Sequence, residues 1–489
     1  MAPILESCRE LLVELGVFLW CTVVRFVFAL WFSWKKPVPL PAVADKLLLR
    51  SATSLAADIR NGKVKSVDVV SAYIRRIREV QPILNAVVED RFEEALEDAK
   101  EVDKFVGSGT MSASQMSTEK PLLGLPFTSK NSIAIKGMRQ DAGSLYWHGR
   151  RAAEDAPSVA FLKAAGAIPL ALTNVPELCM WDDSQNLVDG CTRNPHDTRR
   201  SPGGSSGVVP NAGLLPDVGE NLRQFNCVGP MTRFAEDLPL LLRVLAGSDT
   251  DVFKLNEKVN LKTLKLYYMD TEGSLYISRV TADARRAVRR VVQYLKGAHG
   301  LQERRLHLPE ERFGMFLWFR VLGVMDPQPL AEFYWPGGFN TLVELLRHLV
   351  GAGRITLAAL ASCIIAWFCS FSSKQKGEAY VAAVERARDR LEATLGDDGV
   401  LVLPATTNVA PFQNQDLAFL DSSSLTALFN LFKVPVAVCP VMRSAENLPL
   451  CVQVVAKRGN DRLCLAVARE IENRFGGWID PSAKLKGRV

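Results

Sequence analysis

Ser201-Pro202-Gly203-Gly204-Ser205-Ser206-Gly207 is followed directly by Val208-Val209-Pro210-Asn211. Glycines in such a run let backbone N–H groups and a neighbouring hydroxyl approach a reacting centre, because no Cβ stands in the way. Taken alone the run is weak evidence, since Gly/Ser sequences also form ordinary surface loops. Its meaning depends on what else the chain carries.

A lysine stands at the end of a short apolar run upstream of this serine-rich stretch. The run is Gly124-Leu125-Pro126-Phe127-Thr128-Ser129-Lys130, which is typical of a strand. Burial disfavours the charged form of a lysine, and a lysine must lose its proton before it can act as a general base. Most lysines are solvated surface residues. The position after an apolar strand offers Lys130 such burial, and the family resemblance described next makes it the candidate base.

Several blocks of the chain recur in the order and approximate spacing of one enzyme family. They are Gly124 to Asn131, Ile135 to Met138, Ala164 to Ala167, Thr173 to Glu177, Arg193 to Pro195 and Ser201 to Gly207. With these blocks the chain resembles the amidase signature family, whose members cut amide bonds with a Ser-Ser-Lys triad. The resemblance implies an α/β amidase-signature fold, in which helices cover both faces of a large, mixed, twisted β-sheet.

The resemblance also assigns roles to single residues. Lys130 would pass a proton through Ser205, the bridging serine, to the nucleophilic serine, and would then protonate the leaving amine. Ser206 corresponds to a neighbour whose hydroxyl supports this network. Cys179, Met180 and Ser206 are expected to contact the substrate. No metal and no cofactor takes part in this chemistry.

The chain departs from the family pattern directly after Gly207. There the family continues with a second glycine, a helix and a strand ending in G-x-D-x-G-G-S-I-R, whose serine is the nucleophile. In this chain Val208 begins the next family segment instead. An internal deletion would remove the nucleophile, and loss of the nucleophile alone cost about 10⁶ in rate in another serine hydrolase. We therefore expect hydrolysis to be absent or nearly so.

Later segments resemble the branch of the family that is anchored in membranes and hydrolyses fatty amides and N-acylethanolamines. These segments are Val209 to Asn211, Gly229 to Leu238, Gly396 to Val400, Leu448 to Ala456 and Phe475 to Trp478. The resemblance covers residues 45–480, which are expected to form one amidase domain. It implies a lipid amide as substrate or ligand, a membrane as partner and a homodimer as assembly.

Two other functions remain open on the residues. The first is a non-catalytic, membrane-associated protein that keeps an apolar channel and binds lipid amides or a protein partner. The second is a cysteine hydrolase built on Glu177, Cys179 and Lys130. Glu177 and Cys179 would share one face of a strand at i and i+2, but Pro176 argues against a strand there.

The N-terminal segment is apolar over the thickness of a bilayer. From Leu15 to Trp34 the run contains a single charge, Arg25, and a helix of about 20 apolar residues spans a hydrocarbon core of about 30 Å. A cleaved signal peptide is disfavoured, because the run is too long and no small-residue cleavage motif follows it. We predict a membrane anchor over residues 1–36, with a single-pass transmembrane helix at 15–34, on intracellular membranes.

Apolar runs of strand length alternate with helical patterns along the amidase domain. The expected strands are Leu122 to Phe127, Ala167 to Leu172, Val400 to Leu403, Val434 to Val438 and Val452 to Val455. Ser66 is expected to cap one helix, and a second helix is expected from Arg91 to Val106. The Ser-, Thr- and Met-rich segment from Thr110 to Lys120 is expected to be an exposed loop.

A second apolar region runs from Phe339 to Phe371. It predicts either a buried pair of helices or an amphipathic membrane cap that dips into the interface. The sequence favours neither strongly, because the most apolar part is too short for a confident membrane span.

Composition excludes some functions. The net charge of +6 is spread along the 489 residues in isolated arginine pairs, which argues against nucleic acid as a partner. The ten cysteines show no zinc-type spacing, and Cys179, Cys191, Cys439 and Cys451 stand among apolar or small residues. Reduced, mostly buried thiols are therefore expected.

Overall fold

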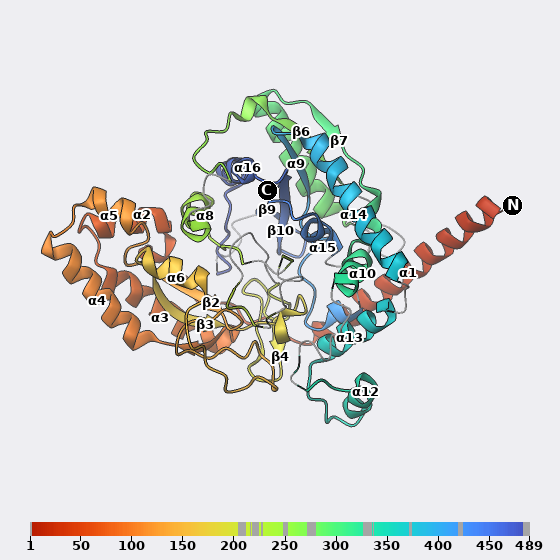
Figure 1. The fold of residues 1–489 in the computed structure, drawn as a ribbon, viewed down its shortest axis with the longest axis horizontal. Coiled ribbons are helices and arrows are strands. Elements are labelled where there is room, and N and C mark those ends of the chain that lie inside the picture. Colours follow the sequence, from red (N-terminus) through yellow and green to blue (C-terminus); the bar gives the residue numbers. More distant parts are fainter. Residues whose placement is uncertain are drawn as a thin grey trace.

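The computed structural model describes residues 2–203, 212–215, 217, 224–225, 228–247, 253–270, 280–325, 335, 337–370, 374–418 and 424–482. Helices and strands alternate along these residues. In Figure 1 the elements between α2 and α6 gather on one side of the molecule, and those between β6 and α16 gather on the other.

The larger sheet has five strands in the order β7-β6-β8-β10-β9. Their bounds are β6 Lys265–Tyr268, β7 Glu303–Arg305, β8 Gly399–Pro404, β9 Val436–Arg443 and β10 Pro449–Ala456. β6 runs parallel to β7 and β8, whereas β10 runs antiparallel to β8 and β9. The sheet is therefore mixed, as expected.

Helices cover both faces of this sheet because its side chains alternate between two cores. Val400 and Val402 of β8 pack with α9 (Ala282–His299) and α16 (Asp461–Phe475). Leu401 and Leu403, which point the other way, pack with α10 (Gly314–Met325), α14 (Lys374–Leu395) and α15 (Ser424–Phe432). β8 is buried along its whole length, which explains why its sequence is a continuous apolar run.

A second sheet has three strands in the order β1-β3-β2. β1 (Val87–Asp90) is antiparallel to β3 (Ile168–Thr173), and β2 (Pro126–Lys130) is parallel to β3. α3 (Ser66–Leu84) and α4 (Phe92–Ser108) bury apolar side chains against β3. Among the strands that the structure describes, β2 pairs with β3 alone. The expected single large sheet is therefore divided into two over the described residues.

Shorter elements connect these layers. Apart from α1, the remaining α-helices of the described residues are α2 Ala52–Arg60, α5 Ala113–Glu119, α6 Pro157–Ala164, α8 Asp237–Ala246, α12 Thr341–Leu349 and α13 Leu357–Ser370. Single-turn helices are η1 Lys46–Leu49, η2 Glu177–Cys179, η4 Leu261–Thr263, η5 Pro309–Phe313 and η6 Gln415–Ala418. A two-stranded ribbon joins β4 (Gln185–Asn186) to β5 (Gly190–Cys191).

The predicted transmembrane helix is wrong. Among the helices of the described residues, none has both the length and the apolar character that a membrane crossing requires. The predicted segment, apart from Trp34, belongs to α1 (Ala2–Ser33), one side of which packs on the domain while other apolar side chains, such as Phe26 and Trp31, are exposed. Val24 and Phe32 are buried, Phe32 stacks on Phe412 at 4.8 Å between ring centroids, and Trp20 donates a hydrogen bond to the carbonyl of Ala418. A single-pass anchor on intracellular membranes is therefore not supported.

Three local predictions also need correction. Ser66 is the first residue of α3, not its cap, because the Asp103 carboxylate accepts hydrogen bonds from the backbone N–H groups of Ser66 and Val67. The expected loop at Thr110 to Lys120 contains helix α5, which begins with a capping box between Ser112 and Gln115. The strand expected from Leu122 begins only at Pro126.

The apolar region at 339–371 is buried in one part and exposed in another. α13 places Ala359, Leu360 and Cys363 in a buried cluster with Trp335, as the buried-helix interpretation predicted. α12, in contrast, leaves apolar side chains exposed, among them Leu342, Leu346 and Leu349.

The cysteines whose side chains the structure describes are free thiols. Cys439 is buried, and Cys191 and Cys451 are half-buried, in keeping with the sequence. Cys179 is exposed, which corrects the expectation of a buried thiol at that position.

The packing of β8 yields a stability prediction. Leu401→Ala should lower the free energy of unfolding by about 2–5 kcal/mol, because Leu401 is fully buried between β8 and its helices. Val438→Ala on β9, whose side chain is 61% exposed, should cost less than about 0.5 kcal/mol. Thermal unfolding of both variants checks this, and equal losses would contradict the assignment of β8 to the core.

Candidate active site

Lys130 lies at the carboxyl end of β2, opposite Thr173 of β3. Its side chain is half-buried. Among the contacts between described residues, its ammonium has no hydrogen-bond or ion-pair partner. The chain then turns sharply, with the Asn131 N–H donating to the carbonyl of Thr173 at 3.0 Å and the Ile133 N–H donating to the carbonyl of Lys130 at 2.9 Å.

A buried pair of side chains fixes this turn. Asn131 and Asp141 are both fully buried. The Asn131 amide donates to Asp141 Oδ1 at 2.6 Å, while the Asp141 N–H donates to Asn131 Oδ1 at 3.2 Å. The Gly143 N–H also donates to Asp141 Oδ1, at 3.1 Å. The residue that follows Lys130 is therefore tied by reciprocal hydrogen bonds to a residue ten positions later.

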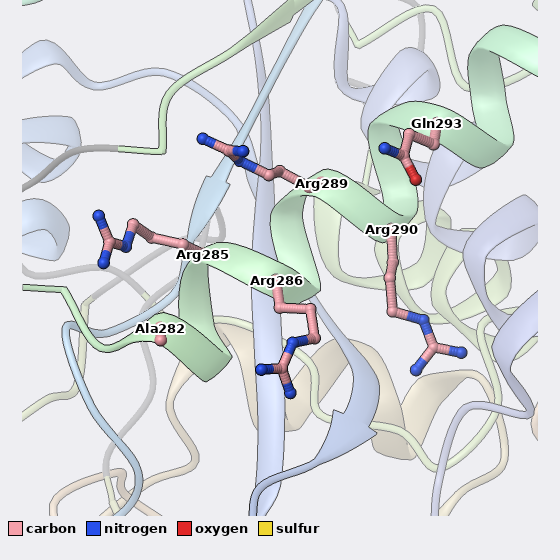
Figure 2. Close-up of a pocket in the computed structure, with 6 residues that line it drawn as sticks. All are labelled: Ala282, Arg285, Arg286, Arg289, Arg290 and Gln293. Atoms are coloured by element: carbon pink, nitrogen blue, oxygen red, sulfur yellow. The ribbon is translucent and has the colours of Figure 1, made fainter. Parts of the chain in front are cut away.

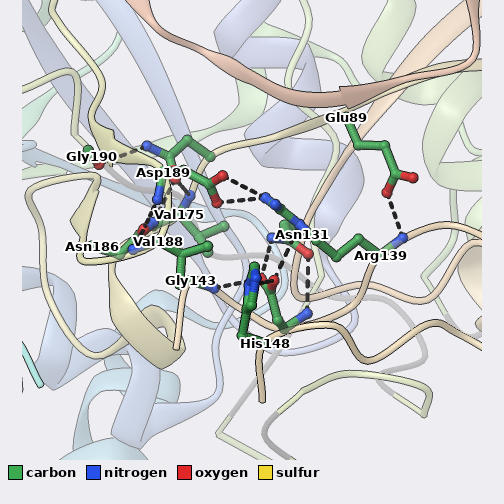
Figure 3. Close-up of polar contacts among 12 residues, drawn as sticks. Glu89, Asn131, Arg139, Gly143, His148, Val175, Asn186, Val188, Asp189 and Gly190 are labelled. Carbon is green, nitrogen blue, oxygen red and sulfur yellow. Dashed lines mark hydrogen bonds and ion pairs between the residues drawn. The ribbon is translucent and has the colours of Figure 1, made fainter. Parts of the chain in front are cut away.

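Arg139 extends this pair into a larger polar network (Figure 3). Its Nε lies 3.2 Å from Asp141 Oδ2, and its Nη2 donates to both carboxylate oxygens of Asp189 at 2.6 Å. The Arg139 N–H donates to Glu89 Oε2 at 2.5 Å. His148 Nδ1 lies 3.6 Å from Asp141 Oδ2. Arg139 thus joins three elements: its backbone N–H contacts β1, and its guanidinium contacts the turn after β2 and the β4–β5 ribbon.

Asn186 holds the ribbon against β3. Its amide donates to Asn174 Oδ1 at 2.6 Å and to the Val175 carbonyl at 2.9 Å. Gly143 passes so close that a Cβ there would lie 2.4 Å from Asn186 Nδ2, and its φ of +67° is left-handed. Only glycine fits this position without displacing the network.

The serine-rich stretch is described as far as Gly203, so Ser205 and Ser206 lie outside the described residues. Its first residues are held by the segment around Asp182. Ser201 Oγ donates to the Asp182 carbonyl at 3.3 Å, and Ser184 Oγ donates to the Gly203 carbonyl at 3.5 Å. Asp183 beside them is buried, and burial raises the pKa of its carboxyl.

Residues 212–215, which follow the serine-rich stretch in the sequence, are hydrogen-bonded to the turn after Lys130. The Ala134 N–H donates to the Gly213 carbonyl at 3.0 Å, and the Leu215 N–H donates to the Ser132 carbonyl at 2.7 Å. The Gln140 amide also donates to the Gly213 carbonyl, at 2.9 Å. Residues 212–215 therefore lie directly beside the turn that follows Lys130.

Glu177 anchors the segment that contains the two predicted substrate contacts, Cys179 and Met180. Its buried carboxylate accepts hydrogen bonds from Ser144 Oγ at 3.2 Å, Trp335 Nε1 at 3.2 Å and the Thr356 N–H at 2.6 Å. Burial raises the pKa of the Glu177 carboxyl, and the hydrogen bonds from these donors only partly oppose that rise.

Leu178 and Cys179 have left-handed backbones, with φ of 52° and 57°. Such strain in non-glycine residues is concentrated at functional sites. Leu178 is buried and Met180 packs on the same cluster of α13 residues, whereas Cys179 is exposed.

The geometry does not assemble a cysteine hydrolase. Glu177–Cys179 form the single-turn helix η2 and not a strand, so Glu177 and Cys179 do not share a strand face. The Glu177 carboxylate is occupied by Ser144, Trp335 and Thr356.

Sequence reasoning missed the Asn131–Asp141 pair, Asp183 and the structural role of Glu177. The only local signal was a set of polar residues between apolar stretches, and such residues are usually solvated. Their burial results from contacts between segments that lie far apart in the sequence.

Comparisons with known proteins agree with this architecture. The profile of the family described as Amidase matches residues 68–207 and 207–465. Fatty-acid amide hydrolase 2-A of Danio rerio is 35% identical over 490 aligned residues, which cover 90% of this chain and 92% of that protein. Fatty-acid amide hydrolase 2 of Homo sapiens is 34% identical, covering 92% and 93%.

Solved structures show the same fold. One described as fatty acid amide hydrolase superposes with a TM-score of 0.65 at 18% identity, covering 89% of this chain and 86% of that chain. The chain belongs to the amidase signature family. Within it, the chain is similar to fatty-acid amide hydrolase 2 over nearly the full length of both proteins.

The environment of Glu177 predicts a pH dependence. Because burial raises its folded-state pKa above the unfolded value of about 4.3, its contribution to stability is present below that pH and is lost as the pH rises through the folded-state pKa. In Glu177→Gln this titration is absent. The unfolding temperature of the wild type minus that of Glu177→Gln should therefore fall as the pH rises from about 4.3.

Glu101→Gln provides the control, because Glu101 is an exposed residue of α4 paired with Lys104. The unfolding temperature of the wild type minus that of Glu101→Gln should show no such decline with pH. A wild-type advantage over Glu177→Gln that grows with pH would mean that the three donors outweigh burial, contrary to the prediction.

Proposed function

We propose that this chain derives from a serine amidohydrolase of the fatty-acid amide hydrolase type and that the segment bearing its nucleophile is missing after Gly207. Its substrate class by descent is the lipid amides, that is, fatty amides and N-acylethanolamines. This class is supported by the similarity to two fatty-acid amide hydrolases, which extends over most of both chains.

The position of Lys130 is the main structural support for this proposal. It is half-buried at the end of β2, and the turn that follows it is hydrogen-bonded to residues 212–215. A lysine in this setting suits a general base that exchanges its proton with hydroxyls. Ser205, the bridging serine of the proposal, would relay that proton.

The proposed deletion rests on two supports. The family profile matches this chain in two blocks that meet at residue 207. In addition, the outer edge of β2 has no paired strand among the described residues, where the parent fold would place further strands. Without the nucleophilic serine, Lys130 has no group to activate, and we infer that turnover of amides is absent or nearly so.

A non-catalytic lipid-amide-binding protein is the second candidate. Met180 and Leu178 pack on the apolar cluster that contains Leu360 and Cys363 of α13. This continuity between the proposed substrate contacts and an apolar region would persist without a nucleophile. A homodimer also stays a prediction, which sedimentation of the purified protein tests.

Restoring the missing segment separates the two candidates. Insertion of the family segment between Gly207 and Val208 should bring back hydrolysis of a long-chain fatty amide. Lys130→Ala in the restored protein should then lower the rate by about 10²–10⁴ or more, because the general base is lost. Lys136→Ala, an exposed lysine in the same loop, should leave the rate within about twofold, as surface substitutions usually do.

The chain without the insertion should not react with an alkyl fluorophosphonate, which labels activated serines. Labelling of Ser205 or Ser206 would reveal a substitute nucleophile and overturn the proposed inactivity. A restored protein that folds and binds the amide without turnover would favour the binding function.

We also propose that the 339–371 region is a cap that meets a lipid surface. Leu346, Leu349 and Val350 of the α12 end are 56%, 76% and 79% exposed. α12 is followed in the chain by α13, and buried residues of α13 belong to the same apolar cluster as Leu178. An exposed apolar face beside the proposed substrate contacts suits the transfer of a lipid amide.

Replacing these three residues with serine should weaken binding to phosphatidylcholine vesicles by more than about tenfold, because each buried CH₂ contributes about 0.8 kcal/mol. The matched control is Leu187→Ser with Met231→Ser, which removes apolar side chains that are exposed elsewhere. Vesicle co-sedimentation measures both. Equal binding by the α12 variant and the wild type would contradict the cap.

A further inference from the structure

Helix α9 presents four arginines on its outer face. Its inner face is held to the large sheet by buried residues that include Val288, Val291 and Leu295. Arg285, Arg286, Arg289 and Arg290 project from the opposite face (Figure 2). Together with Ala282 and Gln293 they line a hollow of about 490 Å³. This basic hollow is formed by residues that play no part in the proposed amide chemistry.

The arrangement is unfavourable for the helix itself. Arg285 and Arg289 are separated by four residues, as are Arg286 and Arg290, and like charges at this spacing repel each other. All four lie in the first half of a helix that begins at Ala282. The positive end of the helix dipole disfavours cations there, most strongly in the first turn. A helix selected for stability alone would carry acidic residues at some of these positions.

Nearby carboxylates orient the guanidiniums. Arg286 Nη1 lies 3.1 Å from Asp283, and Arg289 Nη2 lies 2.7 Å from the buried Asp270, which also contacts Arg305 at 3.1 Å. These pairs leave the side chains of Arg286, Arg289 and Arg305 61%, 64% and 60% exposed. Of the four lining arginines, Arg286 and Arg289 are thus held by carboxylates and remain exposed, and Arg290 lies over the Phe475 ring, 5.6 Å from its centroid.

The chemistry of the hollow selects phosphate. A guanidinium presents paired N–H donors that match the oxygens of a phosphate, and it keeps its charge at every physiological pH. In Figure 2, Arg286 and Arg290 extend to one side of α9 and Arg285 and Arg289 to the other, so each pair spans one helical turn. One turn rises about 5.4 Å along the helix, so each pair presents two guanidiniums from consecutive turns to one ligand.

We infer that the α9 hollow binds a small ligand that carries two or more phosphate groups. A free polyphosphate and the phosphorylated head group of a lipid share this chemistry. The site is independent of amide hydrolysis, because Lys130 lies on β2 in the other sheet.

Calorimetric titration of the full chain with inorganic tripolyphosphate tests the inference. Saturable binding is expected, tighter than that of sulfate at equal ionic strength. Arg286→Gln with Arg290→Gln should weaken it by at least about tenfold, since hydrogen bonds between charged groups are lost. Arg286→Lys with Arg290→Lys keeps the charge and loses the paired donors, so an intermediate loss is expected.

The control is Lys100→Gln with Lys104→Gln, which also removes two exposed cations four residues apart, on α4. It should leave tripolyphosphate binding unchanged. The Arg-to-Gln pair should unfold at or above the wild-type temperature, because two repelling charges are removed from an outer face. Tripolyphosphate binding no tighter than sulfate binding, or an equal loss in the Lys100/Lys104 variant, would overturn the inference.

The two ligand sources are distinguished with vesicles. If binding to phosphatidylcholine vesicles that contain phosphatidylinositol bisphosphate exceeds binding to soluble inositol trisphosphate, and the excess is lost in the Arg286/Arg290 glutamine variant, a lipid head group is the ligand. Equal or tighter binding of the soluble compound identifies a free phosphate ligand.

Discussion

The reciprocal hydrogen bonds between Asn131 and Asp141 are the constraint on which the rest of the candidate site depends. A buried carboxylate is costly unless donors or counter-charges surround it. Here the Asn131 amide and the Gly143 N–H donate to Asp141 Oδ1, and the Arg139 guanidinium forms an ion pair with Oδ2. They close the turn after β2 and fix the direction of the chain next to Lys130. Removing the carboxylate would leave the Asn131 amide without its acceptor, which costs about 1–3 kcal/mol, while Arg139 would keep Asp189 as its partner.

A second buried carboxylate links that turn to the apolar side of the molecule. Glu177 receives donors from Ser144, Trp335 and Thr356, which come from three distant parts of the chain. The strained backbone at Leu178 and Cys179 is therefore held between the polar network and the cluster beneath α13. This connection places Met180 against the apolar cluster that includes Leu360 and Cys363 of α13.

The apolar segments show that one helix can meet two environments. α1 buries Val24 and Phe32 against the domain but leaves Phe26 and Trp31 exposed, as α12 leaves Leu349 exposed. Hydropathy measures only the cost of contact with water and cannot tell a protein neighbour from a lipid neighbour. Charge shows a similar limit. The arginines of α9 form two pairs in the sequence, and only the helix places them on one outer face.

The sequence by itself determined the mixed α/β architecture and the position of Lys130 at a strand end, because both follow from local periodicity and from blocks that resemble the family. It also predicted β3 and β8 to within one residue at each end, since buried strands are continuous apolar runs. The predicted runs covered only the first part of β9 and the middle of β10. Tertiary structure alone decided that Asp103 caps α3, that Thr110 to Lys120 is partly helical, that α1 packs on the domain, and that Asp141 and Glu177 are buried. These outcomes depend on contacts between residues far apart in the chain, and no local pattern encodes the partner that each buried polar or apolar group will find.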